Sequence, residues 1–142
     1  MTSEPPVLVL SDALMRDLLD AARAAGPREI CGFIVHDDKA VQCLPVSNIA
    51  TRSHDRFIMD PAEQIAVFRQ IREQGQTLGA IYHSHPRGEA RPSRHDIDGH
   101  GYPRIPALII APAARHGAVM QAWMMHTQPP QPLPITTTAR FL

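Results

Sequence analysis

Two histidines and an aspartate lie close together in this sequence, in an arrangement that could hold a metal ion. His83 and His85 follow a short apolar and partly β-branched run, which predicts that they end a buried strand over residues 78–85. Because side chains alternate along a strand, the two imidazoles share one face. Asp96 falls in the first turn of a helix predicted to start after Ser93, where the helix dipole favours an ionised carboxylate. Two imidazoles and one carboxylate are a ligand set that a catalytic zinc uses while its fourth position stays open.

A metal site that activates water also needs a base, and Glu29 is the candidate. It stands at the head of the apolar run 30–35, which we predict to be a strand. Considered by itself, a carboxylate at the mouth of a strand is most simply a surface group. Only the ligand set downstream gives Glu29 a functional interpretation.

Together these residues resemble the motif of the JAMM (MPN-plus, Mov34-like) zinc metalloproteases, in particular the short stand-alone prokaryotic members. That motif consists of a Glu, then His-x-His, ten residues and an Asp, with a Ser three positions before the Asp. The chain fills all five positions, with Glu29, His83, His85, Ser93 and Asp96. The matched positions, with the Cys-Gly that follows the glutamate and two flanking prolines, are far more specific than His-x-His alone.

The resemblance implies a zinc ion, Zn²⁺, held by His83, His85 and Asp96, with Glu29 as the general base. It also implies that the hydroxyl of Ser93 hydrogen-bonds the oxyanion of a tetrahedral intermediate. This role is compatible with helix capping, because a cap uses the oxygen as an acceptor and leaves the proton free to donate.

The function that the resemblance implies is a metallopeptidase or isopeptidase. Such an enzyme would cleave after the C-terminal Gly-Gly of a ubiquitin-like or sulfur-carrier protein, its partner and substrate. The alternative is a deubiquitinase-like enzyme of a prokaryotic ubiquitin-like conjugation system. A third hypothesis, which is not an enzyme, is a non-catalytic MPN scaffold subunit. Those subunits lack the metal-binding residues that this chain keeps.

Local signals predict a single-domain α/β fold, a layered sheet with helices packed against it. This agrees with the fold that the resemblance implies, a mixed β-sheet flanked by helices with a cytidine-deaminase-like architecture. Ser11 and Asp60 are expected to cap two helices that end near residues 25 and 74. Strands are expected over residues 7–10, 30–35, 40–46, 78–85, 105–111 and 118–125. Residues 47–59 have neither periodicity and predict a loop.

The C-terminal part of the chain has weaker signals. Four prolines over residues 129–134 are expected to break regular structure, and residues 135–142 to return as a strand or helix, or to fray. The sequence sets neither the strand order nor the oligomeric state.

Composition narrows the remaining possibilities. With 142 residues, 44% of them hydrophobic, we expect one JAMM/MPN-plus domain over residues 1–142. The 14 basic and 14 acidic residues balance, so no overall field favours nucleic acid or membrane as a partner. No signal peptide or membrane-length apolar run is visible, and Cys31 and Cys43 are expected to be reduced thiols, all of which favours a cytoplasmic protein. A nucleophilic Cys31 is the less common alternative.

A second metal fold shares part of the pattern. His83, His85 and Glu89 match the ligand spacing of the first cupin motif, but a cupin needs an all-β barrel and a later asparagine. The only asparagine here is Asn48, upstream of the histidines, so the cupin interpretation is rejected. His95 and His100 are interpreted as polar loop residues.

Overall fold

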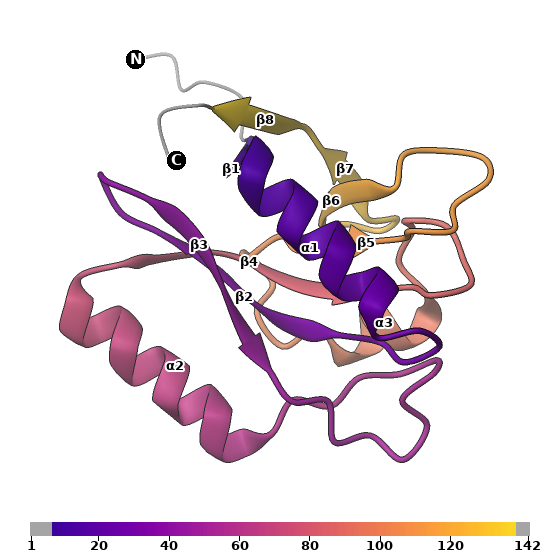
Figure 1. Cartoon of the computed structure of the whole chain (residues 1–142), viewed down its shortest axis with the longest axis horizontal. Helices are drawn as coiled ribbons and strands as arrows, with labels where there is room; N and C mark the ends of the chain where they lie inside the picture. The colour runs from indigo at the N-terminus through magenta and orange to yellow at the C-terminus, as the bar shows by residue number, and fades with distance from the viewer. Residues whose placement is uncertain (1–6, 139–142) are drawn as a thin grey trace.

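The computed structural model describes residues 7–138, which form eight strands and three helices (Figure 1). In chain order these are β1 (Leu8–Ser11), α1 (Asp12–Ala24), β2 (Cys31–His36), β3 (Val41–Val46), α2 (Pro61–Gln74), β4 (Thr77–Ser84), α3 (Arg94–Gly99), β5 (Ala107–Ile110), β6 (Met120–Met124), β7 (Gln131–Leu133) and β8 (Ile135–Thr138). Within these ranges, no helix is both long and apolar enough to cross a membrane.

Six strands form one mixed sheet in the order β3-β2-β4-β5-β6-β7. Strand β2 is antiparallel to β3 and β4, whereas β4 and β5 are parallel. Strands β1 and β8 pair in parallel as a separate two-stranded sheet. This arrangement confirms the predicted α/β fold with a mixed sheet flanked by helices, and it supplies the strand order.

Both long helices begin at the caps that the sequence predicts. The Ser11 hydroxyl accepts the backbone N–H of Leu14 at the start of α1. The Asp60 carboxylate accepts two backbone N–H groups at the start of α2, and Gly75 ends that helix in the left-handed conformation. Each cap satisfies donors that a helix start leaves without partners.

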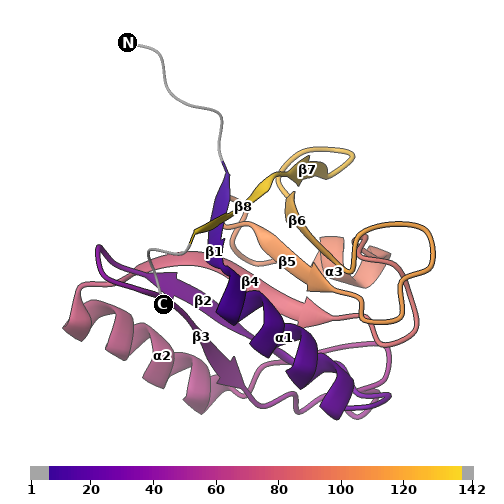
Figure 2. The same cartoon turned by 45° about the horizontal axis from the view of Figure 1, so that its top comes forward.

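The two helices cover opposite faces of the sheet. Helix α1 crosses in front of the strands in both cartoon views (Figures 1 and 2), and its buried Leu18 packs with Ile34. Helix α2 packs through Val67 and Phe68 against Phe33, which alternates with Ile34 along β2. Successive residues along β2 and β4 therefore face α1 and α2 in turn.

One close approach fixes β2 against its neighbours. The Tyr82 ring lies over Gly32, and a Cβ at position 32 would lie 2.5 Å from the Tyr82 hydroxyl and 2.6 Å from the Leu44 carbonyl oxygen. Real Cβ atoms do not approach backbone so closely. Only glycine at position 32 leaves room for both strands beside β2.

The C-terminal segment corrects one prediction. Strand β7 lies inside the proline-rich segment 129–134, so the expectation that these prolines break regular structure is wrong. Pro132 is tolerated because β7 pairs only with β6 and is an edge strand of the described sheet. Residues 135–138 form strand β8, one of the alternatives expected for the C-terminal segment. Residues 139–142 lie outside the described part.

Candidate metal centre

The register of β2 on β4 brings Glu29 to the two histidines. Cys31 pairs with His83, and continuing this antiparallel register by two residues sets Glu29 level with His85. Two hydrogen bonds between Ile30 and Ser84 hold this alignment. The Ile30 N–H donates to the Ser84 hydroxyl at 2.9 Å, and the Ile30 carbonyl accepts the Ser84 N–H at 3.0 Å. Glu29 and both histidines thus share the α2 face of the sheet.

Asp96 reaches the histidines from the start of α3. Ser93 and Asp96 form a reciprocal capping box, with Ser93 Oγ accepting the Asp96 N–H at 3.1 Å and Asp96 Oδ2 accepting the Ser93 N–H at 2.8 Å. The carboxylate then bridges the histidines, with Oδ1 3.0 Å from His83 Nε2 and Oδ2 2.9 Å from His85 Nε2. The helix start therefore aims the carboxylate as well as terminating the loop.

The three side chains form a compact donor set. His83 Nε2 and His85 Nε2 are 3.2 Å apart, and each nitrogen contacts one of the two Asp96 oxygens. The ligands of a tetrahedral zinc lie roughly 3.4 Å apart, given bonds of about 2.0–2.2 Å. A small outward shift of the side chains would accommodate the ion, so the residues fit this metal.

A further hydrogen bond orients His85. Its Nδ1 donates to the Glu89 carbonyl at 2.9 Å, which leaves Nε2 facing the cluster. The Glu89 carboxylate accepts the backbone N–H groups of Arg115 and His116 instead of facing the cluster. Glu89 is therefore an anchor for the loop before β6, and the cupin-like ligand spacing has no counterpart in space.

The electrostatics of the cluster suit a metal. Burial would raise the pKa of Asp96, but the hydrogen bonds from His83 and His85 outweigh it and hold that pKa below its usual range. Burial lowers the pKa of His83, against the opposing effect of Asp96. Burial also lowers the pKa of His85, but the Asp96 and Glu89 hydrogen bonds raise it more. An ionised carboxylate beside two imidazoles is a donor set for a metal ion, which binds imidazoles in their neutral form.

Glu29 is buried beside this cluster, with 6% of its surface exposed. Burial raises the pKa of its carboxyl to about 7, with Asp96 adding to the shift and His85 opposing it. Its Oε1 atom is buried without a hydrogen-bond partner among the described residues. A carboxylate oxygen of this kind beside a donor set fits a site that holds a metal and a water.

The remaining two residues singled out from the sequence differ in setting. Ser93 is exposed, and its hydroxyl proton remains free to donate because the cap uses only the oxygen as an acceptor. Cys31 is buried, its thiol donates to the Val46 carbonyl, and burial with the nearby Glu29 raises its pKa to about 12. Such a thiol stays protonated near neutral pH, so the nucleophilic alternative for Cys31 fails.

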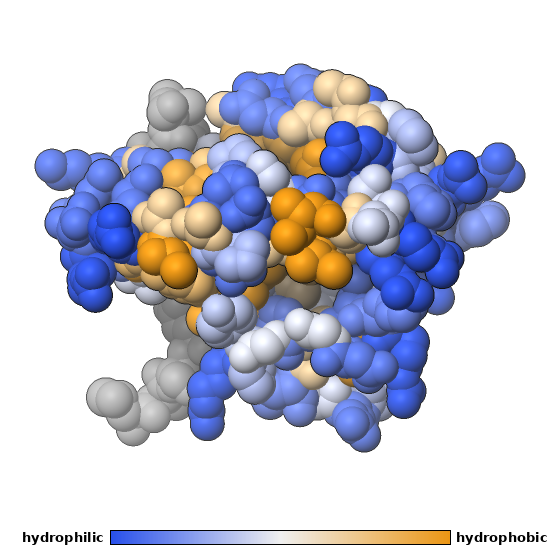
Figure 3. Space-filling view, turned by 90° about the horizontal axis from the view of Figure 1, so that it is seen from below, coloured by the Kyte–Doolittle hydropathy of each residue, from blue (hydrophilic) through white to orange (hydrophobic). Residues whose placement is uncertain are grey.

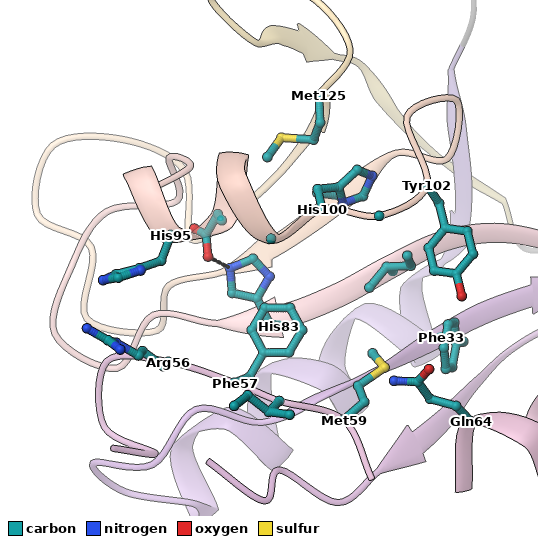
Figure 4. Close-up of a pocket in the computed structure, with 16 residues that line it drawn as sticks. Phe33, Arg56, Phe57, Met59, Gln64, His83, His95, His100, Tyr102 and Met125 are labelled. Atoms are coloured by element: carbon teal, nitrogen blue, oxygen red, sulfur yellow. Dashed lines mark ion pairs between the residues drawn. The ribbon is translucent and has the colours of Figure 1, made fainter. Parts of the chain in front are cut away.

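A cavity of about 400 Å³ opens beside the cluster (Figure 4). Its lining residues come from several separate segments of the chain and include Phe33, Phe57, Met59, Gln64, His83, His95, Asp96, His100, Tyr102 and Met125. Phe57 stacks on the His83 ring with centroids 4.6 Å apart. His100 donates to the Ile105 carbonyl at 2.8 Å and is outside the donor set. Sequence reasoning missed Phe57, since the segment around it has no periodicity.

Comparison with known proteins places these features in a family. Residues 11–126 match the family described as prokaryotic homologs of the JAB domain. The chain is 29% identical over 107 residues to the desampylase of Haloferax volcanii, covering 73% of this chain and 77% of that protein. It is 34% identical over 94 residues to the CysO-cysteine peptidase of Mycobacterium tuberculosis, covering 64% of each chain.

The fold has a solved relative as well. A protein from Desulfitobacterium hafniense with a known solution structure superposes with a TM-score of 0.77 at 28% identity, covering 92% of both chains.

The raised pKa of Glu29 predicts how stability depends on pH in the metal-free protein. A carboxyl group with a pKa raised from 4.5 to about 7 contributes stability that is fully present below pH 4.5 and lost as the pH rises through 7. Glu29→Gln removes this titration. We expect both proteins to melt at similar temperatures near pH 4.5 and the variant to melt higher near pH 8, as measured by thermal unfolding with a chelator present. Parallel curves over this range would show that Glu29 is solvated.

Proposed function

Since the chain belongs to the family of prokaryotic homologs of the JAB domain and carries the JAMM motif, we propose that it is a zinc-dependent peptidase or isopeptidase. Its substrate would be a ubiquitin-like or sulfur-carrier protein, cut after a C-terminal Gly-Gly. The single observation that carries this proposal is the convergence of His83, His85 and Asp96 beside the buried Glu29 carboxylate, whose Oε1 atom has no hydrogen-bond partner among the described residues.

The names of two relatives support the class of substrate. One is named a desampylase and the other a CysO-cysteine peptidase, and both are names of enzymes that cleave a bond in their substrate. We carry the ubiquitin-like or sulfur-carrier substrate over to this chain as part of the proposal. Free Cys31 and Cys43 thiols suit a reducing compartment, so we assign the reaction to the cytoplasm.

In the proposed reaction, His83, His85 and Asp96 would hold the zinc ion. Zinc bound there supplies a Lewis acid that acidifies a water molecule and polarises the scissile carbonyl. Glu29 takes a proton from the attacking water and returns it to the leaving amine as the C–N bond breaks. In the metal-free protein burial raises the pKa of the Glu29 carboxyl, which favours a group that can carry the proton between the two transfers.

Ser93 has two roles in the proposal. Its oxygen caps α3 by accepting the Asp96 N–H, and its proton is assigned to the oxyanion that develops on the scissile carbonyl. Both roles use the same side chain without conflict, because a hydroxyl accepts and donates at once.

The surface around the cavity suits a protein substrate. Ile58 and Tyr102 line the cavity and are 56% and 40% exposed. Seen from below in Figure 3, hydrophobic side chains gather within a largely hydrophilic face. Apolar groups within a polar surround are typical of sites where another protein binds.

Cleavage of a defined substrate tests this function. The zinc-loaded protein should release a short extension placed after the Gly-Gly of a ubiquitin-like sulfur carrier, with the products identified by mass spectrometry. Glu29→Gln should keep its fold and lose most turnover, because an amide cannot accept the proton. Replacing Gly-Gly by Val-Val in the substrate controls for the assigned cut. Equal rates for wild type and Glu29→Gln would contradict the mechanism, and no release from either a fusion or an isopeptide conjugate would contradict the function.

Ser93→Gly separates capping from catalysis in the same assay. Glycine replaces serine as a helix cap at a cost of only a few tenths of a kcal/mol, so the melting temperature should change little. The lost hydroxyl should lower kcat by roughly 10²–10³, the usual effect of removing one oxyanion donor. Full kcat in this variant would leave Ser93 with the capping role alone.

A further inference from the structure

The position of the Glu29 side chain is not explained by the sheet alone. Glu29 precedes β2 by two residues and so lies outside the described strand ladder. Its Oε1 atom has no hydrogen-bond partner to hold the carboxylate in place. The geometry of the proposed base must therefore come from whatever holds its backbone.

Two groups of the loop before α2 hold that backbone. The Glu29 N–H donates to the Ser53 carbonyl at 2.6 Å. The Glu29 carbonyl accepts from Asn48 Nδ2 at 3.0 Å. With Ile30 tied to Ser84 on β4, every backbone polar group from the Glu29 N–H to the Ile30 carbonyl is bonded.

Asn48 uses all the hydrogen-bonding capacity of its side chain in this loop. Besides Glu29, its Nδ2 donates to the Arg56 carbonyl at 3.0 Å. Its Oδ1 accepts the N–H groups of Ala50 and Ile58, both at 3.0 Å. An amide group has two donor hydrogens and two acceptor lone pairs, so these four bonds fill it.

The same loop also contacts one of the histidines of the donor set. Phe57 lies between Arg56 and Ile58, the two residues whose backbone Asn48 binds, and its ring stacks on His83. One side chain thus joins the backbone of the base to the segment that packs on the donor set.

We propose that Asn48 is a positioning residue, which sets the Glu29 carboxylate against the metal centre by holding the Glu29 carbonyl to the 48–58 loop. The inference rests on the proposed function for its catalytic consequence, while the hydrogen-bond clamp stands independently of it. Asn48 touches no reacting atom and acts only through the backbone that it binds.

Asn48→Asp isolates the donor side of the clamp. A carboxylate of the same shape still accepts from Ala50 and Ile58 but cannot donate to Glu29 or Arg56. Asn48→Ala removes all four bonds without adding charge, so either variant that folds provides the test. Asp60→Ala is the matched control, because it weakens the start of α2 at the end of the same loop and leaves the clamp intact.

Kinetics with zinc-loaded protein measure the catalytic effect. We expect Asn48→Asp to lower kcat by about 10²-fold, the scale of a small misplacement of a reacting group, with KM and zinc affinity near those of wild type. Asp60→Ala should lower the melting temperature and keep kcat. In a Glu29→Gln background, Asn48→Asp should change the residual rate by less than about 3-fold, since coupled residues are not additive. An equal fold-loss in both backgrounds, or wild-type kcat in folded variants, would overturn the positioning role.

A measurement without substrate or metal tests the clamp itself. Because Asn48 is the only asparagine, selective ¹⁵N-asparagine labelling gives one pair of side-chain N–H signals in the NMR spectrum. The two protons of this amide should exchange slowly with solvent. In uniformly ¹⁵N-labelled protein, exchange at the Glu29 backbone amide should accelerate in Asn48→Asp but not in Asp60→Ala. Fast exchange of the Asn48 amide in wild type would overturn the clamp even if no substrate were cleaved. An intact clamp with no cleavage of any substrate would instead count against the proposed function alone.

Discussion

The site depends on one carboxylate that belongs to a helix cap and to the donor set at once. Asp96 accepts the Ser93 N–H in the capping box, and its two oxygens contact His83 and His85. The hydrogen bonds that these histidines make offset the effect of burial on the Asp96 pKa, so the group stays ionised at low exposure. Without the cap, the backbone at the start of α3 would no longer hold the Asp96 carboxylate against the histidines. The histidines would then lack a charged partner.

The sheet supplies the second constraint. Alternation along β4 sends His83 to the α2 face and Tyr82 to the α1 face, where Tyr82 packs over Gly32. The tight contact at Gly32 fixes the register between β2 and β4, and that register brings Glu29 beside His85. Packing on the opposite face of the sheet from the metal centre thus contributes to the placement of the proposed base, together with the 48–58 loop that holds the Glu29 backbone.

Local signals in the sequence predicted the parts of the fold that depend on neighbouring residues. Ser11 and Asp60 cap the helices as expected, and the hairpin of β2 and β3 follows its hydrophobic pattern. Strand order depends on long-range pairing, which a single sequence does not encode locally. The prolines of β7 misled the prediction, because an edge strand tolerates a residue that lacks an N–H.

The same division applies to the site. His83, His85 and Asp96 could be selected because their spacing follows strand and helix rules, and the structure brings them within reach of one ion. Asn48 and Phe57 could not, because the loop that contains them has no periodicity and their roles arise from contacts across the chain. A polar side chain with every hydrogen bond filled, such as Asn48, is visible only once the fold is known.

Zinc content of the purified protein tests the central claim most directly. Elemental analysis should find about one zinc ion per chain in wild type and in Glu29→Gln, since Glu29 lies outside the ligand set. Asp96→Asn, which keeps a polar group in the cap, and the His83→Ala, His85→Ala double variant should lose the metal. Full zinc occupancy in that double variant, or none in wild type supplied with zinc, would contradict the assignment of this cluster as a metal centre.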